Sequence, residues 1–213
     1  MKPRFLALIL CSAVLVGTTG TTLADEAKKA DAKKAASDAK PAELTPEQKA
    51  MMQFVEMNKP GDAHKVLASF AGDWNLEVKS YMAPDTPPSV SKGTCTSTMI
   101  MDGRYLEDKV SGDMMGQPFA GQGLMAYDNI HKKYVSTWID NMSTAIIQTE
   151  GTYDPASKTF TFQGMSYDPM AGKDVPVKMI TKIVDDKTHT FEWWGPGPKG
   201  DMMKAMEINY TRK

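Results

Sequence analysis

The fold is decided by residues 72–82, which read GDWNLEVKSYM. Large apolar side chains alternate with polar ones along this stretch, so that Trp74, Leu76 and Val78 share one face. A period of two is typical of a β-strand with one buried face. The residues before Gly72 have helical spacing instead, so we expect the chain to change from helix to strand at this glycine.

Turn signals recur at short intervals after this first strand. They are residues 84–88 (PDTPP), 102–103 (DG), 115–118 (MGQP), 128–129 (DN), 154–155 (DP), 168–169 (DP), 185–186 (DD) and 195–198 (GPGP). The segments between them are rich in Thr, Val, Ile and aromatic residues, which favour strands. About ten short strands with no helix between them predict an antiparallel meander.

A β-sandwich and an up-and-down barrel both fit this number of strands. A Greek-key sandwich needs long crossover connections, and none stands out in the sequence, while closure of a barrel removes exposed strand edges. We therefore predict a mainly β fold, an antiparallel up-and-down β-barrel over residues 72–213. A barrel of this size is just wide enough to hold its own side chains or one small ligand.

One or two short helices are expected in residues 45–71, before the barrel. Thr45 and Gln48 have the spacing of a capping box at the start of the first helix. A second helix is expected over residues 62–70, with apolar residues on one side and His64 at the surface. Residues 45–71 are thus expected to form N-terminal helices before the barrel.

Residues 1–24 have the pattern of a secretory signal peptide. A basic beginning is followed by an apolar stretch over residues 5–16, too short for the roughly 20 helical residues that span a bilayer. We predict cleavage near Ala24 and an exported, periplasmic or secreted protein without a membrane span. The alternative, a lipoprotein anchored through Cys11, lacks the small residue expected before the cysteine. Residues 25–44, rich in Ala, Lys and Asp, are expected to form a disordered tether.

The composition argues against several classes of function. A net charge of -1 gives no basic face for nucleic acid. The chain has 2 cysteines and 3 histidines, which disfavours a disulfide framework and a multi-histidine metal site. Cys95 lies in a strand without a nearby histidine and is interpreted as a packing residue. No nucleophile elbow, zinc-protease motif or phosphate loop is present, so we expect no metal site, and catalysis is the less favoured interpretation.

Two resemblances follow from particular residues. Gly72-x-Trp74 before the first strand, with Arg212 in the last, resembles the calycin superfamily, which includes lipocalins. That resemblance implies that Trp74 packs across the closed end of the barrel with Arg212 over its ring.

A second resemblance is to the bacterial domain-of-unknown-function family 1579. It is carried by residues 60–67 (PGDAHKVL), 127–129 (YDN), 134–140 (YVSTWID) and 207–212 (EINYTR). It implies an exported, calycin-like barrel and no established activity.

The candidate ligand-binding residues lie mainly on one predicted strand. Ser136, Trp138 and Asp140 share a face, so that if Trp138 faces the interior, Asp140 does too, near the mouth. There Asp140 either meets the turn and water or anchors a polar head group, and Asp108 raises the same question. The 17 methionines suggest adaptable packing or a pliable pocket, with Cu(I) binding as a third interpretation, and Met99 and Met165 are expected to line the interior.

Three functions remain open from the sequence. The first is a barrel that holds a small apolar or amphipathic molecule, which is the expected partner. The second is an envelope interaction or structural module whose barrel is filled by its own side chains. The third is an enzyme that uses an acid such as Asp140 or a haem bound through His189, the one plausible axial ligand. The volume of the interior discriminates between the first two.

Overall fold

The structure is a computed structural model, which describes residues 43–83, 86–114, 116–198 and 200–213. The predicted signal peptide, most of the predicted tether and Cys11 lie outside these residues. Residues 50–213 form one compact unit that contains the short helix α3 and every strand.

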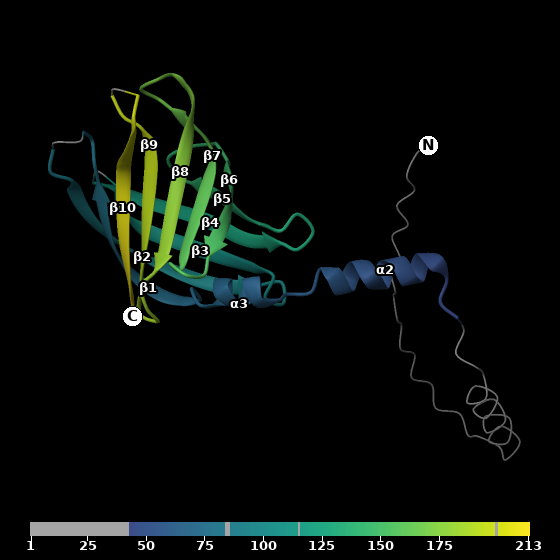
Figure 1. The fold of residues 1–213 in the computed structure, drawn as a ribbon. Coiled ribbons are helices and arrows are strands. Elements are labelled where there is room, and N and C mark those ends of the chain that lie inside the picture. The colour runs from purple at the N-terminus through teal and green to yellow at the C-terminus, as the bar shows by residue number, and fades with distance from the viewer. Residues whose placement is uncertain (1–42, 84–85, 115, 199) are drawn as a thin grey trace, which may run out of the picture. The chain divides into compact units, whose positions relative to one another are not determined.

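Ten antiparallel strands close into a barrel (Figure 1). Each strand pairs with its neighbours in sequence, and β1 also pairs with β10 to complete the closure. The predicted up-and-down barrel is therefore confirmed. The strands are β1 (Gly72–Ser80), β2 (Ser89–Ile100), β3 (Tyr105–Met114), β4 (Gln117–Asp128), β5 (Lys133–Asp140), β6 (Ile147–Asp154), β7 (Thr159–Asp168), β8 (Lys173–Ile183), β9 (Thr188–Pro196) and β10 (Met202–Arg212).

Alternation along the strands separates the inside of the barrel from the outside. In β1, Trp74 and Leu76 are buried while Asn75 is exposed, as the sequence pattern predicts. In β2, Cys95 and Ser97 are buried and point inward. Because every strand closes on its neighbours, these inward residues together surround one interior space, called the lumen below.

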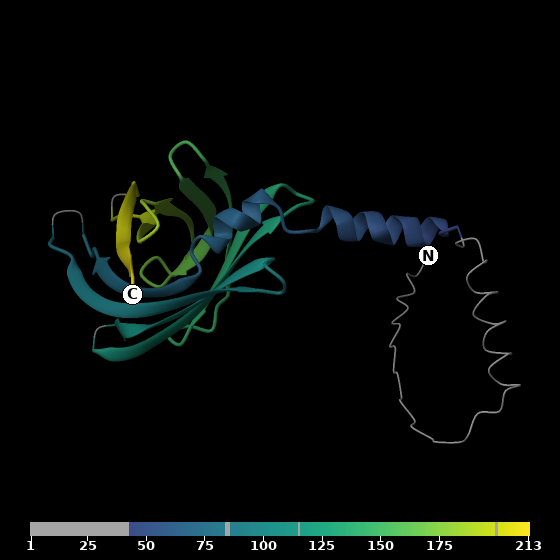
Figure 2. The same ribbon diagram turned by 90° about the horizontal axis from the view of Figure 1, so that it is seen from below.

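Two helices precede the barrel. Helix α2 (Pro46–Met57) begins with the predicted capping box, in which Gln48 N donates to Thr45 Oγ1 at 3.2 Å and Thr45 N donates to Gln48 Oε1 at 2.9 Å. Helix α3 (Asp62–Ala68) packs against β2, β3 and β4 and lies across one end of the barrel (Figure 2). The apolar residues of α2 are all exposed: Met51, Met52, Phe54, Val55 and Met57.

His64 differs from its expected surface position. Its side chain is only 6% exposed, and Nδ1 accepts a hydrogen bond from Gly61 N at 3.1 Å. The ring also meets Tyr127 edge to face, with centroids 6.0 Å apart. The prediction was wrong because the imidazole satisfies a backbone donor at the start of α3, which gives it a structural reason to be buried.

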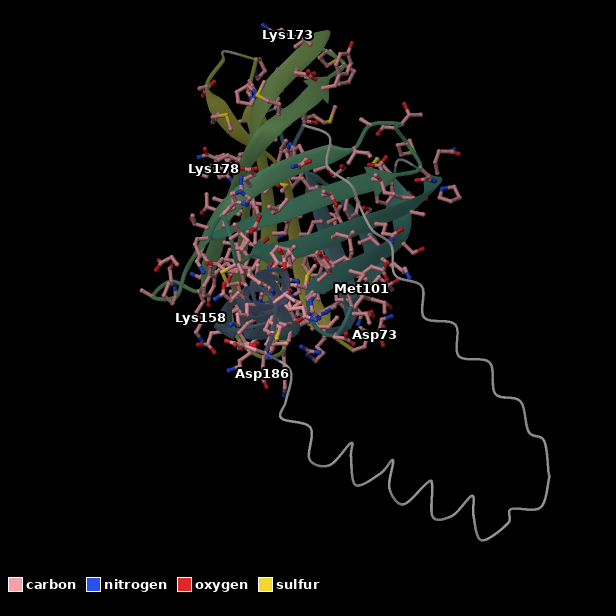
Figure 3. All side chains as sticks on the ribbon, turned by 90° about the vertical axis from the view of Figure 1, so that its right-hand side faces the viewer. Asp73, Met101, Lys158, Lys173, Lys178 and Asp186 are labelled. Carbon is pink, nitrogen blue, oxygen red and sulfur yellow. The ribbon has the colours of Figure 1, made fainter. Side chains whose placement is uncertain are left out.

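The end of the barrel beneath α3 is closed by packing. Leu67 of α3 and Phe70, which follows it, join Leu106, Tyr134 and Phe160 in one buried cluster. The opposite end carries the connections β1–β2, β3–β4, β5–β6, β7–β8 and β9–β10, among them the turn before Lys173, whereas Met101, Lys158 and Asp186 lie toward the closed end (Figure 3). The barrel therefore has one end closed by α3 and the residues beneath it, and an opposite end formed by turns alone.

Candidate functional site

A large cavity occupies the barrel lumen. Its volume is about 1620 Å³, and its lining comes from every strand and from Phe70 at the closed end. Small-molecule sites in proteins are usually roughly 300–1,000 Å³. The lining includes Met82, Met114 and Met142 at the end opposite to α3, so the cavity opens at that end, called the mouth below. The interior is thus not filled by the protein's own side chains.

Methionines from different connections surround the mouth. Their side chains are 39–94% exposed, and they come from the five hairpins at this end. These rim methionines are Met82, Met114, Met142, Met170 and Met202. Flexible thioether side chains at an opening adapt to ligands of different shapes.

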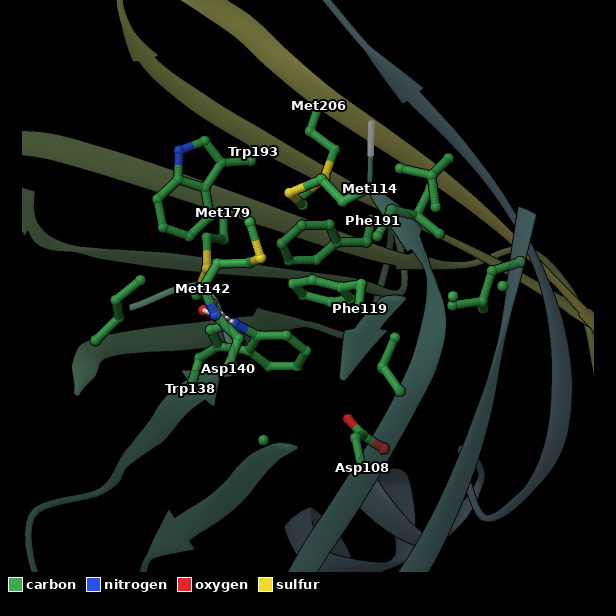
Figure 4. A pocket seen from close by; sticks show the side chains of 18 of the residues that line it. Asp108, Met114, Phe119, Trp138, Asp140, Met142, Met179, Phe191, Trp193 and Met206 are labelled. Carbon is green, nitrogen blue, oxygen red and sulfur yellow. Dashed lines mark hydrogen bonds between the residues drawn. The ribbon is translucent and has the colours of Figure 1, made fainter. Parts of the chain in front are cut away.

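Trp138 forms one wall of the lumen. Its indole lies over the strand β4 at Gly121 and Gly123, and an added Cβ at Gly121 would overlap the ring. Phe119 stacks on it, with centroids 6.4 Å apart and an angle of 16° between the planes. The two glycines thus leave the space that the indole fills, which puts a flat apolar surface inside the barrel. Phe191 and Trp193 lie nearby in the same pocket (Figure 4).

Asp140 lies near the mouth, but its oxygens are already used by the protein. Oδ2 accepts from Trp138 Nε1 at 2.9 Å, and Oδ1 accepts from the backbone N–H groups of Met142 and Ser143 at 2.9 and 3.0 Å. The carboxylate therefore holds the indole and the turn after β5 in place. Of the two roles considered from the sequence, this arrangement agrees with the one in which Asp140 meets the turn. Ser136, two residues before Trp138, also lines the cavity.

Neither of the two methionines expected inside lines the cavity. Met165 is 54% exposed on the outer face of β7, because the inward residues of that strand are the even-numbered ones, such as Phe160 and Phe162. Met99 points inward but packs against the buried cluster at the closed end. The methionines that do line the cavity interior are Met125, Met179 and Met206.

Asp108 is a lining carboxylate that hydrogen-bonds to the Ser97 side chain and keeps one oxygen without a partner among the described residues. It lies between Leu106 and Val110 on the inner face of β3, and its side chain projects into the pocket (Figure 4). Its Oδ1 atom is buried and has no hydrogen-bond partner among the described residues. Burial raises the pKa of this carboxyl to about 6, an effect that the neighbouring Ser97 partly offsets and Glu107 reinforces. The folded protein therefore favours the protonated form more than the unfolded chain does.

Further polar residues lie deep in the lumen. Thr149, Thr181 and Ser97 are 1–7% exposed, and all three line the cavity. Thr149 Oγ1 is buried without a hydrogen-bond partner in the described part of the chain. Thr149 and Thr181 are functional candidates that the sequence reasoning missed, although each alternates with outward residues of its strand in the same way as the apolar lining does.

His189 is packed as an aromatic residue of the barrel core. Its ring stacks on Tyr210 at 4.0 Å and meets Trp74 and Phe70 edge to face at 4.4 and 4.9 Å. Burial, with a contribution from Arg212, lowers the pKa of the imidazole to about 3. Three rings around one side chain do not fit the open approach that a haem iron needs, so we assign no haem ligand here.

Cys95, a further titratable group of the interior, is also a packing residue. Its side chain is 1% exposed, and burial raises the pKa of the thiol to about 12, which leaves it protonated and poorly nucleophilic. The described residues contain no group of three or more His, Cys, Asp or Glu side chains that could hold a metal ion. No helix among them combines the length and apolar character that crossing a membrane requires.

Trp74, Arg212 and Gly72 meet at the closed end. Trp74 is 2% exposed and donates from Nε1 to Phe70 O at 2.8 Å. The Arg212 guanidinium carbon lies 4.2 Å from the centre of the Trp74 ring, and the two residues are direct partners between β1 and β10. Gly72 has φ 140°, and a Cβ there would overlap Arg212 Nη1. Only glycine fits this position, because it tolerates the positive φ and has no Cβ to overlap the guanidinium group.

Solved structures that match the chain include the following two. The M. tuberculosis protein Rv2717c matches with a TM-score of 0.54 and 12% identity, over 73% of this chain and 99% of that chain. A redesigned β-barrel matches with a TM-score of 0.36 and 13% identity, over 70% of this chain and 95% of that chain. The likeness to Rv2717c concerns the fold alone. No curated protein matches the chain by sequence.

Comparison with protein families gives a more direct result. The family described as a protein of unknown function (DUF1579) matches residues 59–212. This range contains α3 and all the strands of the barrel. The chain therefore belongs to the DUF1579 family.

Proposed function

We propose that this protein is an exported carrier that binds a small apolar or amphipathic molecule in the barrel lumen. The observation that carries the proposal is the cavity itself, which has about 1620 Å³ of space and opens at the rim methionines. Export rests on the pattern of residues 1–24. Binding would bury apolar ligand surface against the lining, which stabilises a complex by about 25 cal/mol per Å².

The lining supports a ligand with a long apolar part. Aromatic and methionine side chains form the walls, and the indole of Trp138 offers a flat surface next to Phe119. Polar lining residues are placed at different depths, with Asp140 near the mouth and Asp108 nearer the closed end. A mostly apolar pocket with a few polar groups is typical of small-molecule sites.

The other two functions have less support. A barrel that acts only as a filled structural module would not leave a cavity of this size. Asp140 gives no support to an acid-using enzyme, because its oxygens are engaged by Trp138 and the following turn. The packing of His189 likewise gives no support to a haem enzyme.

A fluorescence titration tests the proposal. The probes are medium-chain amphiphiles, a quinone and haem, and the readout is the indole emission of Trp138, with Trp138→Phe identifying its share of the signal. We expect saturable binding of at least one apolar or amphipathic class, because the indole lies on the cavity wall.

A pair of variants on β5 locates the binding site. Ser136→Phe places a ring inside the lumen, whereas Ile139→Phe makes a comparable change on the outer face, where Ile139 is 46% exposed. We expect Ser136→Phe to weaken binding at least tenfold and Ile139→Phe to leave it unchanged. Equal affinity of the two variants, or no saturable binding by any probe, would contradict the proposal.

A further inference from the structure

Two buried side-chain atoms of the described residues have no hydrogen-bond partner, and both belong to the same cavity. They are Asp108 Oδ1 and Thr149 Oγ1. Asp108 lies on β3 and Thr149 on β6, so they flank the strand pair β4–β5 that carries the indole of Trp138. A buried polar atom without a partner costs free energy, so such atoms mark places where a ligand can be recognised.

The surroundings of Asp108 leave room for a ligand group. Its cross-strand partners are Ser97 on β2 and Gly123 on β4. Gly123 has no side chain, and the indole of Trp138 comes within 3.3 Å of the position of its missing Cβ. Leu106 and Val110 line the cavity on either side along the strand. The carboxyl group therefore faces the cavity from an apolar wall beside an aromatic ring.

Among the described residues, no fixed cation faces this carboxyl group. The influences that shift its pKa are burial, Ser97 and Glu107, with no lysine or arginine among them. Lys92, the lysine that borders the cavity, belongs to the exposed outer face of β2. Among the described arginines, Arg212 is bound to backbone carbonyls at the closed end, and Arg104 donates to Met101 O there.

The other lining carboxyl groups are engaged in turns. Asp140 accepts from Trp138 and from the turn after β5, and Asp113 accepts from Gly116 N at 2.8 Å. The interior thus presents negative charge and acceptor atoms without positive side chains to balance them. Such a cavity disfavours a ligand with a carboxylate head, because like charges would meet in a site with little water.

We infer that Asp108 and the adjacent wall form a head-group site for an amphiphile with a protonated amine. The amphiphile enters head first, and its apolar chain extends toward the rim methionines. The inference rests on the proposed function, since it names the class of ligand for the same cavity. The ammonium group would donate to Asp108 and lie beside the Trp138 ring, whose face attracts cations.

Calorimetric titration with a matched pair of ligands tests this inference. The probes are a linear alkylamine and the linear carboxylate of the same chain length, both below their micelle concentrations and at neutral pH. We expect the parent protein to bind the amine at least tenfold more tightly. Asp108→Asn should weaken amine binding by about 10- to 100-fold, the range for a lost hydrogen bond to a charged group, and leave the carboxylate unchanged or tighter.

Glu107→Gln is the matched control on the same strand. It makes the same chemical change one residue away, on the outer face of β3, where Glu107 pairs with Lys109 and Gln122. We expect it to change amine affinity less than twofold, which separates a contact with Asp108 from a general loss of negative charge. Circular dichroism melts of both variants establish that each is folded.

The outcomes separate this inference from the proposed function. Equal affinity for amine and carboxylate, or equal weakening of both by Asp108→Asn, overturns the amine site while the carrier function stands. Binding of neither probe, nor of the alcohol of the same chain length, overturns both. An amine preference that survives Asp108→Asn places the recognition elsewhere in the lumen and overturns the role of Asp108.

Discussion

Removing the guanidinium group of Arg212 should loosen the closed end of the barrel. This side chain donates from Nε to Asp186 O at 2.9 Å, from Nη1 to Ala71 O at 2.8 Å and from Nη2 to Ser69 O at 3.1 Å. It also lies over the Trp74 ring at 4.2 Å. One residue therefore ties the end of α3 and the turn before β9 to the last strand.

The size of the effect follows from these contacts. The hydrogen bond to Ala71 is partly buried, while those to Ser69 and Asp186 are exposed and contribute less. With the cation–π contact included, we expect Arg212→Met to lower the free energy of unfolding by about 2–4 kcal/mol. For a domain of this size, that corresponds to a fall in melting temperature of about 5–15 °C.

Thermal melts followed by circular dichroism measure this change. Arg212→Lys keeps the charge but not the fork of donors, so it should fall between the parent and Arg212→Met. Arg104→Met is the matched control, because Arg104 also lies at this end but makes a single exposed hydrogen bond, to Met101 O at 3.2 Å. If Arg212→Met melts within a degree or two of the parent, or no lower than Arg104→Met, the account of the closed end is refuted.

Three further predictions concern the lumen and the N-terminus. Because burial raises the pKa of Asp108 from 3.8 to about 6, the folded state binds more protons than the unfolded state between these values, and its stability falls as pH rises through them. Asp108→Asn should remove this fall. Urea titration should show that it raises the unfolding free energy by about 1–3 kcal/mol at pH near 7 but leaves it unchanged at pH below 4. Equal effects at both pH values would contradict this prediction. Gly121→Val should displace the Trp138 indole, which should appear as a changed emission maximum. Gly61→Ala, at a position with open space and φ -125°, should leave the emission maximum unchanged. The mass of the protein recovered from its native compartment should correspond to a chain that starts at Asp25, and an intact Met1 would contradict the predicted signal peptide.

Much of the fold could be predicted because its signals are local. Closely spaced turn residues define the strands, and alternation along residues 74–78 identifies the inner face of β1. The apolar side of residues 62–70 likewise indicated a helix that packs, and Leu67 and Phe70 are buried beneath it. These features depend on short-range patterns that tertiary contacts reinforce.

The candidate site was harder to predict because it depends on which face of each strand points inward. The prediction that Met165 lines the interior was wrong, because Phe160 and Phe162 set the inward face of β7 at even positions. Asp108 lies between two apolar residues of its own face, a signal that was available in the sequence. That its Oδ1 has no partner depends on the strands beside it, which local patterns do not specify.

The role of Asp140 likewise depends partly on local sequence and partly on a neighbouring strand. Its position at the end of a strand was predicted, and an aspartate there commonly accepts from backbone N–H groups two and three residues on. The hydrogen bond from Trp138 depends on the indole lying over Gly121 and Gly123, which belong to the neighbouring strand. Contacts of this kind follow from strand register and cannot be read along a single strand.

The central claim is that the lumen admits an amphiphile head first, with its polar end at Asp108. Anomalous diffraction from crystals soaked with an alkylamine brominated at the far end of its chain tests this most directly. The account predicts one bromine peak inside the mouth, near the rim methionines, with density for the chain running past Trp138 toward Asp108. A bromine peak at the closed end, or peaks found on the outer surface of the barrel alone, would contradict it.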